Sequence, residues 1–157
     1  MARPARHITS SFLLSRLGQE ATARYRQALR PLGLTAQSFA VLKVLHAIGP
    51  CSQQDLGSAL GIDSSNLASV VAQLVDRGLV GRERDEANRR RYVLQLDRPG
   101  LDLLAEGLET VADGEREMLN PLTETERTDL FALLSRLAAT ALDDPLLRGD
   151  AEPARHP

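Results

Sequence analysis

Apolar side chains recur every three to five positions along most of this chain, which is the spacing of one face of an α-helix. Residue types that cap helices stand before several of these runs, among them Thr35, Ser52 and Asp63. Six helices are predicted, over residues 8–32, 35–48, 52–60, 63–77, 97–119 and 123–142. Gly107 and Gly114 each weaken the fifth helix by about 1 kcal/mol relative to alanine, although glycine also permits a close helix approach or a bend.

The hydrophobic period changes to two between the fourth and fifth helices. Residues 79–84 and 92–96 are short β-prone runs, and apolar and polar side chains alternate in the second. The polar segment 85–91 between them is typical of a hairpin loop. The sequence therefore predicts a mainly α fold with a small β-hairpin (α+β).

A chain of 157 residues favours a single domain, 1–157. Within it the middle portion, residues 35–97, forms a self-contained unit, and helical segments 8–32 and 98–142 flank it. Residues 143–157 are acidic and lack periodicity, so a disordered tail is expected there.

Charge and cysteine content narrow the class of protein. The net charge is −2, but six arginines against three acids give a local net charge of +3 over residues 77–91. The single cysteine, Cys51, excludes an intrachain disulfide framework. Without a signal peptide or a long apolar span, we expect a cytoplasmic protein with no membrane partner.

The helices predicted over 52–60 and 63–77 are joined by a short glycine-containing turn, which matches a helix-turn-helix. The second carries short polar side chains opposite its apolar stripe, and such side chains bond to base edges or phosphates in the major groove. The candidate contacts on this helix are Ser64, Ser65, Asn66, Ser69 and Gln73. Asn66 and Gln73 suit a bidentate contact with adenine. The alternative is an ordinary solvated helix face.

Arginines crowd the tip of the predicted hairpin directly after this helix. Arginine inserts well into a narrow minor groove, where the negative potential is enhanced. The candidate contacts on the hairpin are Arg84, Asn88, Arg89, Arg90 and Arg91. A plain surface charge run is the alternative. Together these features predict a winged helix-turn-helix DNA-binding domain, with the hairpin as the wing.

The chain resembles the MarR family of winged-helix transcriptional regulators over about residues 8–142. The motifs that carry the resemblance are GLTAQSFAVLKVL at 33–45 and the run from Ser52 to Gly100, above all GLVGRERDEANRRRYVLQL. Family wings have the form Asp-x-x-Asp-Arg-Arg, in which the second Asp holds a wing arginine through an ion pair. Asn88 replaces that Asp here, so it can accept a hydrogen bond but carries no charge for the ion pair. By motif position, the resemblance makes Arg90 the minor-groove arginine, with Arg89 or Arg91 on phosphates.

The resemblance also implies an assembly and a mode of action. MarR-like proteins are dimers built from their first, fifth and last helices, so segments 8–32 and 98–142 become dimerisation helices. A twofold dimer places two recognition helices about one DNA turn apart on a pseudo-palindrome. The expected partners are double-stranded DNA and a second copy of the chain, and the expected role is repression.

Family members often bind a small molecule between the dimer helices and the winged domain. The resemblance suggests Ser11, Ser15, His46 and Leu108 as lining residues here. The alternative for His46 is an ordinary histidine near a helix end. Peroxide-sensing relatives carry their cysteine in the first helix, which Cys51 does not match, so we interpret Cys51 as structural.

Other functional classes find little support in the sequence. It contains no phosphate loop, nucleophile elbow or zinc-ligand motif, so we expect no enzymatic activity, no metal and no cofactor. The main alternative is a winged-helix protein–protein adaptor that does not bind DNA, in which the arginines dock an acidic partner.

Overall fold

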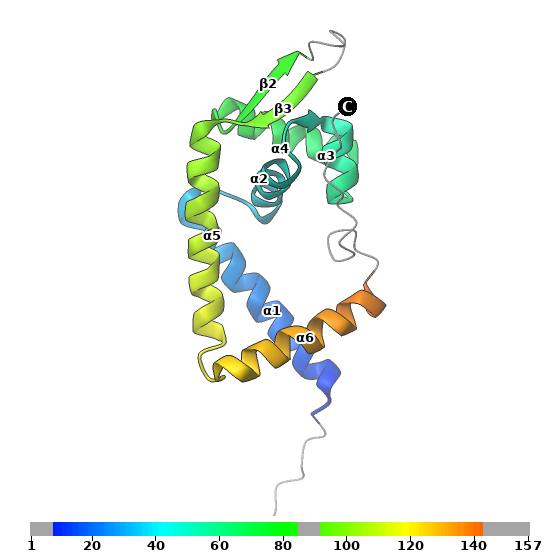
Figure 1. Ribbon diagram of the computed structural model, residues 1–157, viewed down its shortest axis with the longest axis vertical. Helices are drawn as coiled ribbons and strands as arrows, with labels where there is room; N and C mark the ends of the chain where they lie inside the picture. The colour runs from blue at the N-terminus through cyan, green and yellow to red at the C-terminus, as the bar shows by residue number, and fades with distance from the viewer. Residues whose placement is uncertain (1–7, 85–91, 143–157) are drawn as a thin grey trace, which may run out of the picture.

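The computed structural model describes residues 8–84 and 92–142, and Figure 1 shows the path of the chain. The helices are α1 (Ser10–Leu29), α2 (Ala36–Ile48), α3 (Gln53–Leu60), α4 (Ser64–Asp76), α5 (Arg98–Met118) and α6 (Glu124–Ala141). Strands β1 (Cys51–Ser52), β2 (Val80–Arg84) and β3 (Tyr92–Leu96) form one antiparallel sheet in the order β1-β3-β2. The predicted α+β fold, with a helix-turn-helix followed by a β-hairpin, is confirmed. The expected tail, residues 143–157, lies outside the described residues.

Two local features differ from the prediction. The first helix was expected to reach residue 32, but α1 ends at Leu29 and a 3-10 turn, η1 (Arg30–Leu32), follows because Pro31 cannot continue an α-helix. Gly33 ends that turn with a left-handed φ of 63°. The two-residue strand β1 was not predicted, because two residues are too few to show a period.

The register of the hairpin decides which side chains share a face. Val80 pairs with Leu96, Arg82 with Leu94, and Arg84 with Tyr92. Paired residues and every second residue along a strand point to the same side of a sheet. Val80 and Leu94 are each only 1% exposed, so this side of the sheet faces the helical core at its base and runs outward to the pair Arg84–Tyr92.

The core lies under the winged portion of the chain. Its fully buried apolar side chains all fall between residues 29 and 104 and include Phe39, Leu42, Leu56, Leu67, Leu74 and Leu94. Arg77, at the end of α4, donates to the carbonyl oxygens of Leu32 and Gly33 at 3.1 and 2.7 Å and so links α4 to the turn after α1. Because α4 also packs against β2, the helix-turn-helix and the wing are held on one support.

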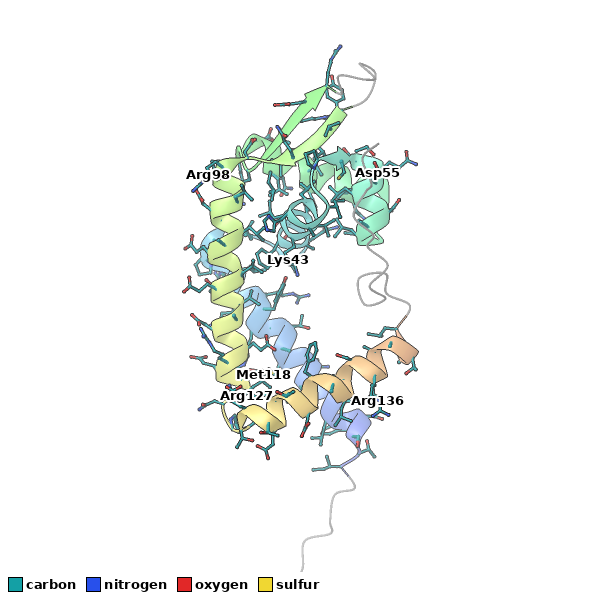
Figure 2. The ribbon with its side chains drawn as sticks, viewed as in Figure 1. Lys43, Asp55, Arg98, Met118, Arg127 and Arg136 are labelled. Atoms are coloured by element: carbon teal, nitrogen blue, oxygen red, sulfur yellow. The ribbon has the colours of Figure 1, made fainter. Side chains whose placement is uncertain are left out.

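The outer helices bury much less. α5 runs along one side of the molecule from the wing to α6, and Figure 2 marks its two ends with Arg98 and Met118. α5 packs on α1 and α2, but α6 packs extensively on no element of the described chain and contains no buried residue. Large apolar side chains are exposed at the start of the described chain, through the first turns of α1, and on α6: Ile8, Phe12, Leu13, Leu14, Leu17, Phe131, Leu133, Leu134 and Leu137. We call this set the outer apolar surface.

No single helix of the described chain has the length and apolar character needed to cross a membrane. Two helical segments that meet at 79°, Ser10–Leu32 and Ala36–Ile48, reach that length and apolar character when they are taken together.

Candidate nucleic-acid interface

Asp63 organises the start of α4. Its Oδ1 accepts hydrogen bonds from the backbone N–H groups of Ser65 and Asn66, both at 3.1 Å, which satisfies two donors that a helix N-terminus leaves open. The Ser65 hydroxyl donates to the same oxygen at 2.6 Å. These bonds, led by the one from the Ser65 hydroxyl, lower the pKa of Asp63, so the carboxylate is ionised at neutral pH. That negative charge partly offsets the attraction of the helix N-terminus for a phosphate.

The polar face predicted for the recognition helix is exposed. Leu67, Val71 and Leu74 are buried on the inner side of α4. Ser65, Asn66, Ser69 and Gln73 are all exposed on the outer side, and Ser64 is the first residue of the helix. Ser69 lies one helical turn beyond Ser65, and Gln73 one turn further, so they form a row along the helix. This row faces away from the core, as the apolar stripe of the helix predicted.

The amide of Asn66 is held in one orientation by the cap. Its Nδ2 donates to Asp63 Oδ2 at 2.5 Å. An asparagine amide has two N–H hydrogens and one carbonyl oxygen, so one N–H and the oxygen remain for another partner. One donor beside one acceptor is the pattern that recognises adenine in the major groove. The contact with Asp63 therefore orients the Asn66 amide and leaves it one donor and one acceptor.

The outer end of strands β2 and β3 carries a cluster of three side chains. The Cζ atom of Arg82 lies 4.4 Å from the centroid of the Tyr92 ring, and that of Arg84 lies 5.8 Å from it. Both arginines are exposed, and Tyr92 is 41% exposed. Arg84 was a predicted contact, but Arg82 and Tyr92 were missed. The predicted hairpin could have indicated part of this cluster, because strands that end at Arg84 and begin at Tyr92 place these two residues opposite each other.

The other wing candidates, Asn88, Arg89, Arg90 and Arg91, lie outside the described residues. Their assignment to DNA therefore stays a prediction.

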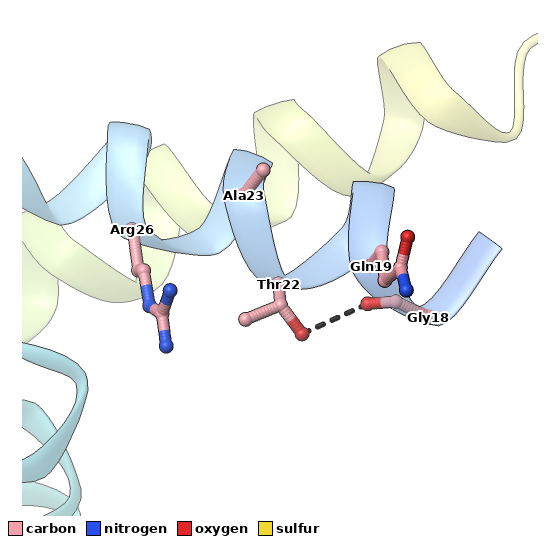
Figure 3. Close-up of a pocket in the computed structure, with 5 residues that line it drawn as sticks. All are labelled: Gly18, Gln19, Thr22, Ala23 and Arg26. Carbon is pink, nitrogen blue, oxygen red and sulfur yellow. Dashed lines mark hydrogen bonds between the residues drawn. The ribbon is translucent and has the colours of Figure 1, made fainter. Parts of the chain in front are cut away.

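The candidate ligand residues lie on three helices. Ser11 and Ser15 are exposed on the first turns of α1, His46 is exposed in the last turn of α2, and Leu108 is 46% exposed on α5. A shallow hollow of about 410 Å³ lies instead on the surface of α1, lined by Gly18, Gln19, Thr22, Ala23 and Arg26. Figure 3 shows these side chains, with the Thr22 hydroxyl donating to the Gly18 carbonyl at 2.8 Å. None of the four predicted residues lines this hollow.

The part of the chain that the structure describes contains neither a cluster of metal-binding side chains nor a reactive thiol. There, no group of three or more His, Cys, Asp or Glu side chains could hold a metal ion. Burial raises the pKa of the Cys51 thiol to about 11, and the nearby Asp55 carboxylate adds to the increase. A thiol with so high a pKa is protonated at neutral pH and is a poor nucleophile. This agrees with a structural interpretation of Cys51.

Comparisons with known proteins point to one family. A family model described as MarR family matches residues 34–92. A Thauera aromatica protein named for transcriptional regulation of the hcr operon is 33% identical over 119 residues, which are 73% of this chain and 72% of that protein. The name of this relative describes a transcriptional regulator.

Two solved structures share the fold over most of their length. The transcriptional repressor CouR bound to a 23-mer DNA duplex superimposes with a TM-score of 0.72 at 27% identity, covering 83% of this chain and 92% of CouR. BpsR of Bordetella bronchiseptica, whose DNA binding is regulated by 6-hydroxynicotinic acid, gives a TM-score of 0.68 at 28% identity, covering 87% and 98%. Both similarities extend beyond the winged portion to the flanking helices.

Proposed function

The chain belongs to the MarR family of winged-helix transcriptional regulators, and from this premise we propose that it is a homodimeric repressor of a pseudo-palindromic operator, released by a small-molecule ligand. The observation that carries the proposal is the exposed polar row on α4 next to a wing that bears arginines. In this proposal residues 35–97 bind DNA, while segments 8–32 and 98–142 dimerise.

Within each subunit, α4 enters the major groove and the wing follows the adjacent minor groove. Ser64, Ser65, Asn66, Ser69 and Gln73 are the proposed contacts from α4, and Arg84, Asn88, Arg89, Arg90 and Arg91 those from the wing. Short polar side chains allow the helix backbone to approach the bases closely. The arginines supply the phosphate and minor-groove contacts that fix the register of the protein on the duplex.

The outer apolar surface supports the homodimer. Phe12 is 55% exposed, Phe131 73% and Leu137 54%, and monomeric proteins rarely leave so many large apolar side chains together in water. A second copy of the chain would cover this surface and place two recognition helices on one side of the duplex.

The proposed release by a ligand rests on the relatives. The DNA binding of BpsR is regulated by 6-hydroxynicotinic acid, a small aromatic acid. We propose Ser11, Ser15, His46 and Leu108 as positions that line the corresponding site between the dimer helices and the winged portion. Any molecule that binds the free protein more tightly than the DNA-bound form would shift the equilibrium toward release.

Selection of bound sequences from random duplexes is the experiment that tests this function most directly. We expect enrichment of a pseudo-palindrome whose half-sites lie about one helical turn apart, because a twofold dimer presents two equivalent α4 helices. Recovery of unenriched sequences would contradict specific recognition, and enrichment of a single half-site would contradict the dimer.

We expect Asn66→Ala and Ser69→Ala to change sequence preference more than general affinity. Loss of one bidentate contact removes about 1–3 kcal/mol of discrimination at one base pair, while nonspecific affinity depends on the phosphate contacts. Repeating the selection with each variant measures this. If both variants selected the same operator as the unmodified chain, the proposed orientation of α4 would be wrong.

Arg90→Ala is expected to weaken binding to specific and nonspecific duplexes alike. If Arg90 meets a phosphate, the slope of log affinity against log salt becomes shallower by about one unit, because one fewer counterion is released. Titrations of one specific and one random duplex at several salt concentrations measure both effects. Unchanged isotherms would remove Arg90 from the contact.

The same salt series separates the repressor from a protein–protein adaptor. A DNA-binding dimer shows a steep fall in affinity with salt and a preference among duplexes. An adaptor with an arginine docking patch would show little preference among duplexes of any sequence.

A further inference from the structure

The wing contains a residue whose geometry assigns it a role in DNA binding beyond the contacts proposed above. We propose that Tyr92 is a positioning residue: its ring holds the guanidinium groups of Arg82 and Arg84 in place to bind the phosphate backbone of the duplex. This inference rests on the proposed DNA binding, and it adds Arg82 and Tyr92 to the residues on which that binding depends.

The contact geometry supports positioning of both arginines. The Cζ atoms lie 4.4 Å (Arg82) and 5.8 Å (Arg84) from the Tyr92 ring centroid, within the range of about 6 Å over which a guanidinium is attracted to an aromatic face. A planar guanidinium that contacts a ring through its face keeps the N–H groups at its edges for hydrogen bonding. Contact with the ring and contact with a phosphate are therefore compatible, and the ring reduces the freedom that the arginines would otherwise lose on binding DNA.

The register places this cluster on the same side of the wing as the helices. Arg82 and Arg84 share their side of β2 with Val80, and Tyr92 shares its side of β3 with Leu94. Val80 and Leu94 are buried in the core beneath, which includes residues of α2, α3 and α4. The arginines thus extend from the side of the wing that joins the helix-turn-helix, and α4 packs directly against β2.

The exposure of Tyr92 argues against a purely core role. Leu94, two residues further along the same side, is 1% exposed, whereas Tyr92 is 41% exposed and lies beyond the core. Tyr92 belongs neither to the buried core nor to the partly buried apolar residues packed against it. Its close neighbours include two cations, Arg82 and Arg84, which a duplex backbone attracts.

The test is a double-mutant cycle on the full chain, read by titration of a labelled random-sequence duplex at low ionic strength. Tyr92→Leu removes the aromatic face, and the pair Arg82→Gln with Arg84→Gln removes the charges it positions. We expect Tyr92→Leu alone to weaken binding about fivefold. In the background of the two glutamines it should have no further effect, because the groups on which it acts are gone. Tyr92→Phe keeps the ring face and should bind within about twofold of the unmodified chain.

The salt dependence adds a measurement that a merely structural role would not change. Removal of both arginines should make the slope of log affinity against log salt shallower by about two units, one for each phosphate that is no longer neutralised. Thermal unfolding of each variant measures any loss of stability separately. An equal loss of affinity from Tyr92→Leu with and without the arginines, or no loss in either background, would overturn the proposal. An unmodified chain that binds no duplex at all would overturn the proposed function together with this inference.

Discussion

Replacement of Gly100 by alanine is expected to lower the free energy of unfolding by about 3 kcal/mol, near the upper end of ordinary overpacking. Gly100 lies in the first turn of α5, and a methyl group there would collide with the carbonyl oxygen of Leu79 and come within 3.2 Å of Leu96 Cδ2. The Leu79 carbonyl accepts from the Asp97 N–H, and the Leu79 N–H donates to Leu74. Because both the carbonyl oxygen and the N–H of Leu79 are hydrogen-bonded, its backbone could move aside only by breaking or stretching these bonds.

The same substitution at Gly114 is the matched control. Gly114 also lies in α5, but apart from its chain neighbours and the surrounding helix backbone, no atom of the described chain lies within 4 Å of the position its methyl group would take. Alanine there should raise stability by up to about 1 kcal/mol through helix propensity. Thermal unfolding at one fixed protein concentration measures both variants, and for a chain of this size each kcal/mol moves the midpoint by about 2–4 °C. Equal shifts at the two positions would contradict the close packing of the first turn of α5 against Leu79 and Leu96.

The glycines of α5 show where a prediction from sequence alone stops. Propensity treats Gly107 and Gly114 alike, because it considers only the helix that contains them. In the structure a methyl group at Gly107 would press into the ring of Phe39, which is 1% exposed, whereas Gly114 has open space. The difference arises from a residue on α2, far away in the sequence, so only the packed fold could show which glycine permits the close approach.

Local signals predicted the helices well because each signal is complete within a few residues. The helix predicted over 123–142 begins with such a signal, a capping box: the Thr123 hydroxyl accepts from the Glu126 N–H, and Glu126 Oε2 accepts from the Thr123 N–H. The outward row on α4 followed in the same way from the apolar stripe of that helix. β1 escaped prediction because it exists only through its pairing with β3.

How much of the candidate site could be predicted depends on how far apart its residues lie in the sequence. Arg84 was predicted from charge alone, but the contact of Arg82 with Tyr92 depends on the register of two strands. The four ligand candidates lie on three helices, so their arrangement depends on tertiary packing and, in the proposed dimer, on a second subunit. The spacing of apolar residues along each helix specifies neither the tertiary packing nor the contact with a second subunit.

Leu137→Glu is expected to convert the protein to a single subunit and to weaken its binding to the selected operator by about 100-fold or more. Leu137 is 54% exposed on α6, which contains no buried residue in one chain, so the substitution should leave the fold of that chain intact. In a twofold dimer each substitution occurs twice, and burial of two carboxylates in an apolar interface costs far more than association can offset. A single subunit then binds each half-site separately, without the high effective concentration that its partner provides.

Ala132→Glu is the matched control, because it adds the same charge to an exposed position of α6 on the side opposite Leu137. It should leave both assembly and operator affinity unchanged. Sedimentation analysis at micromolar concentration measures assembly, and titration of the selected duplex measures affinity. If Leu137→Glu remained a dimer with full affinity, α6 could not lie in the interface. If instead it became a single subunit that still bound the operator as tightly, recognition of the operator would not depend on pairing of two subunits.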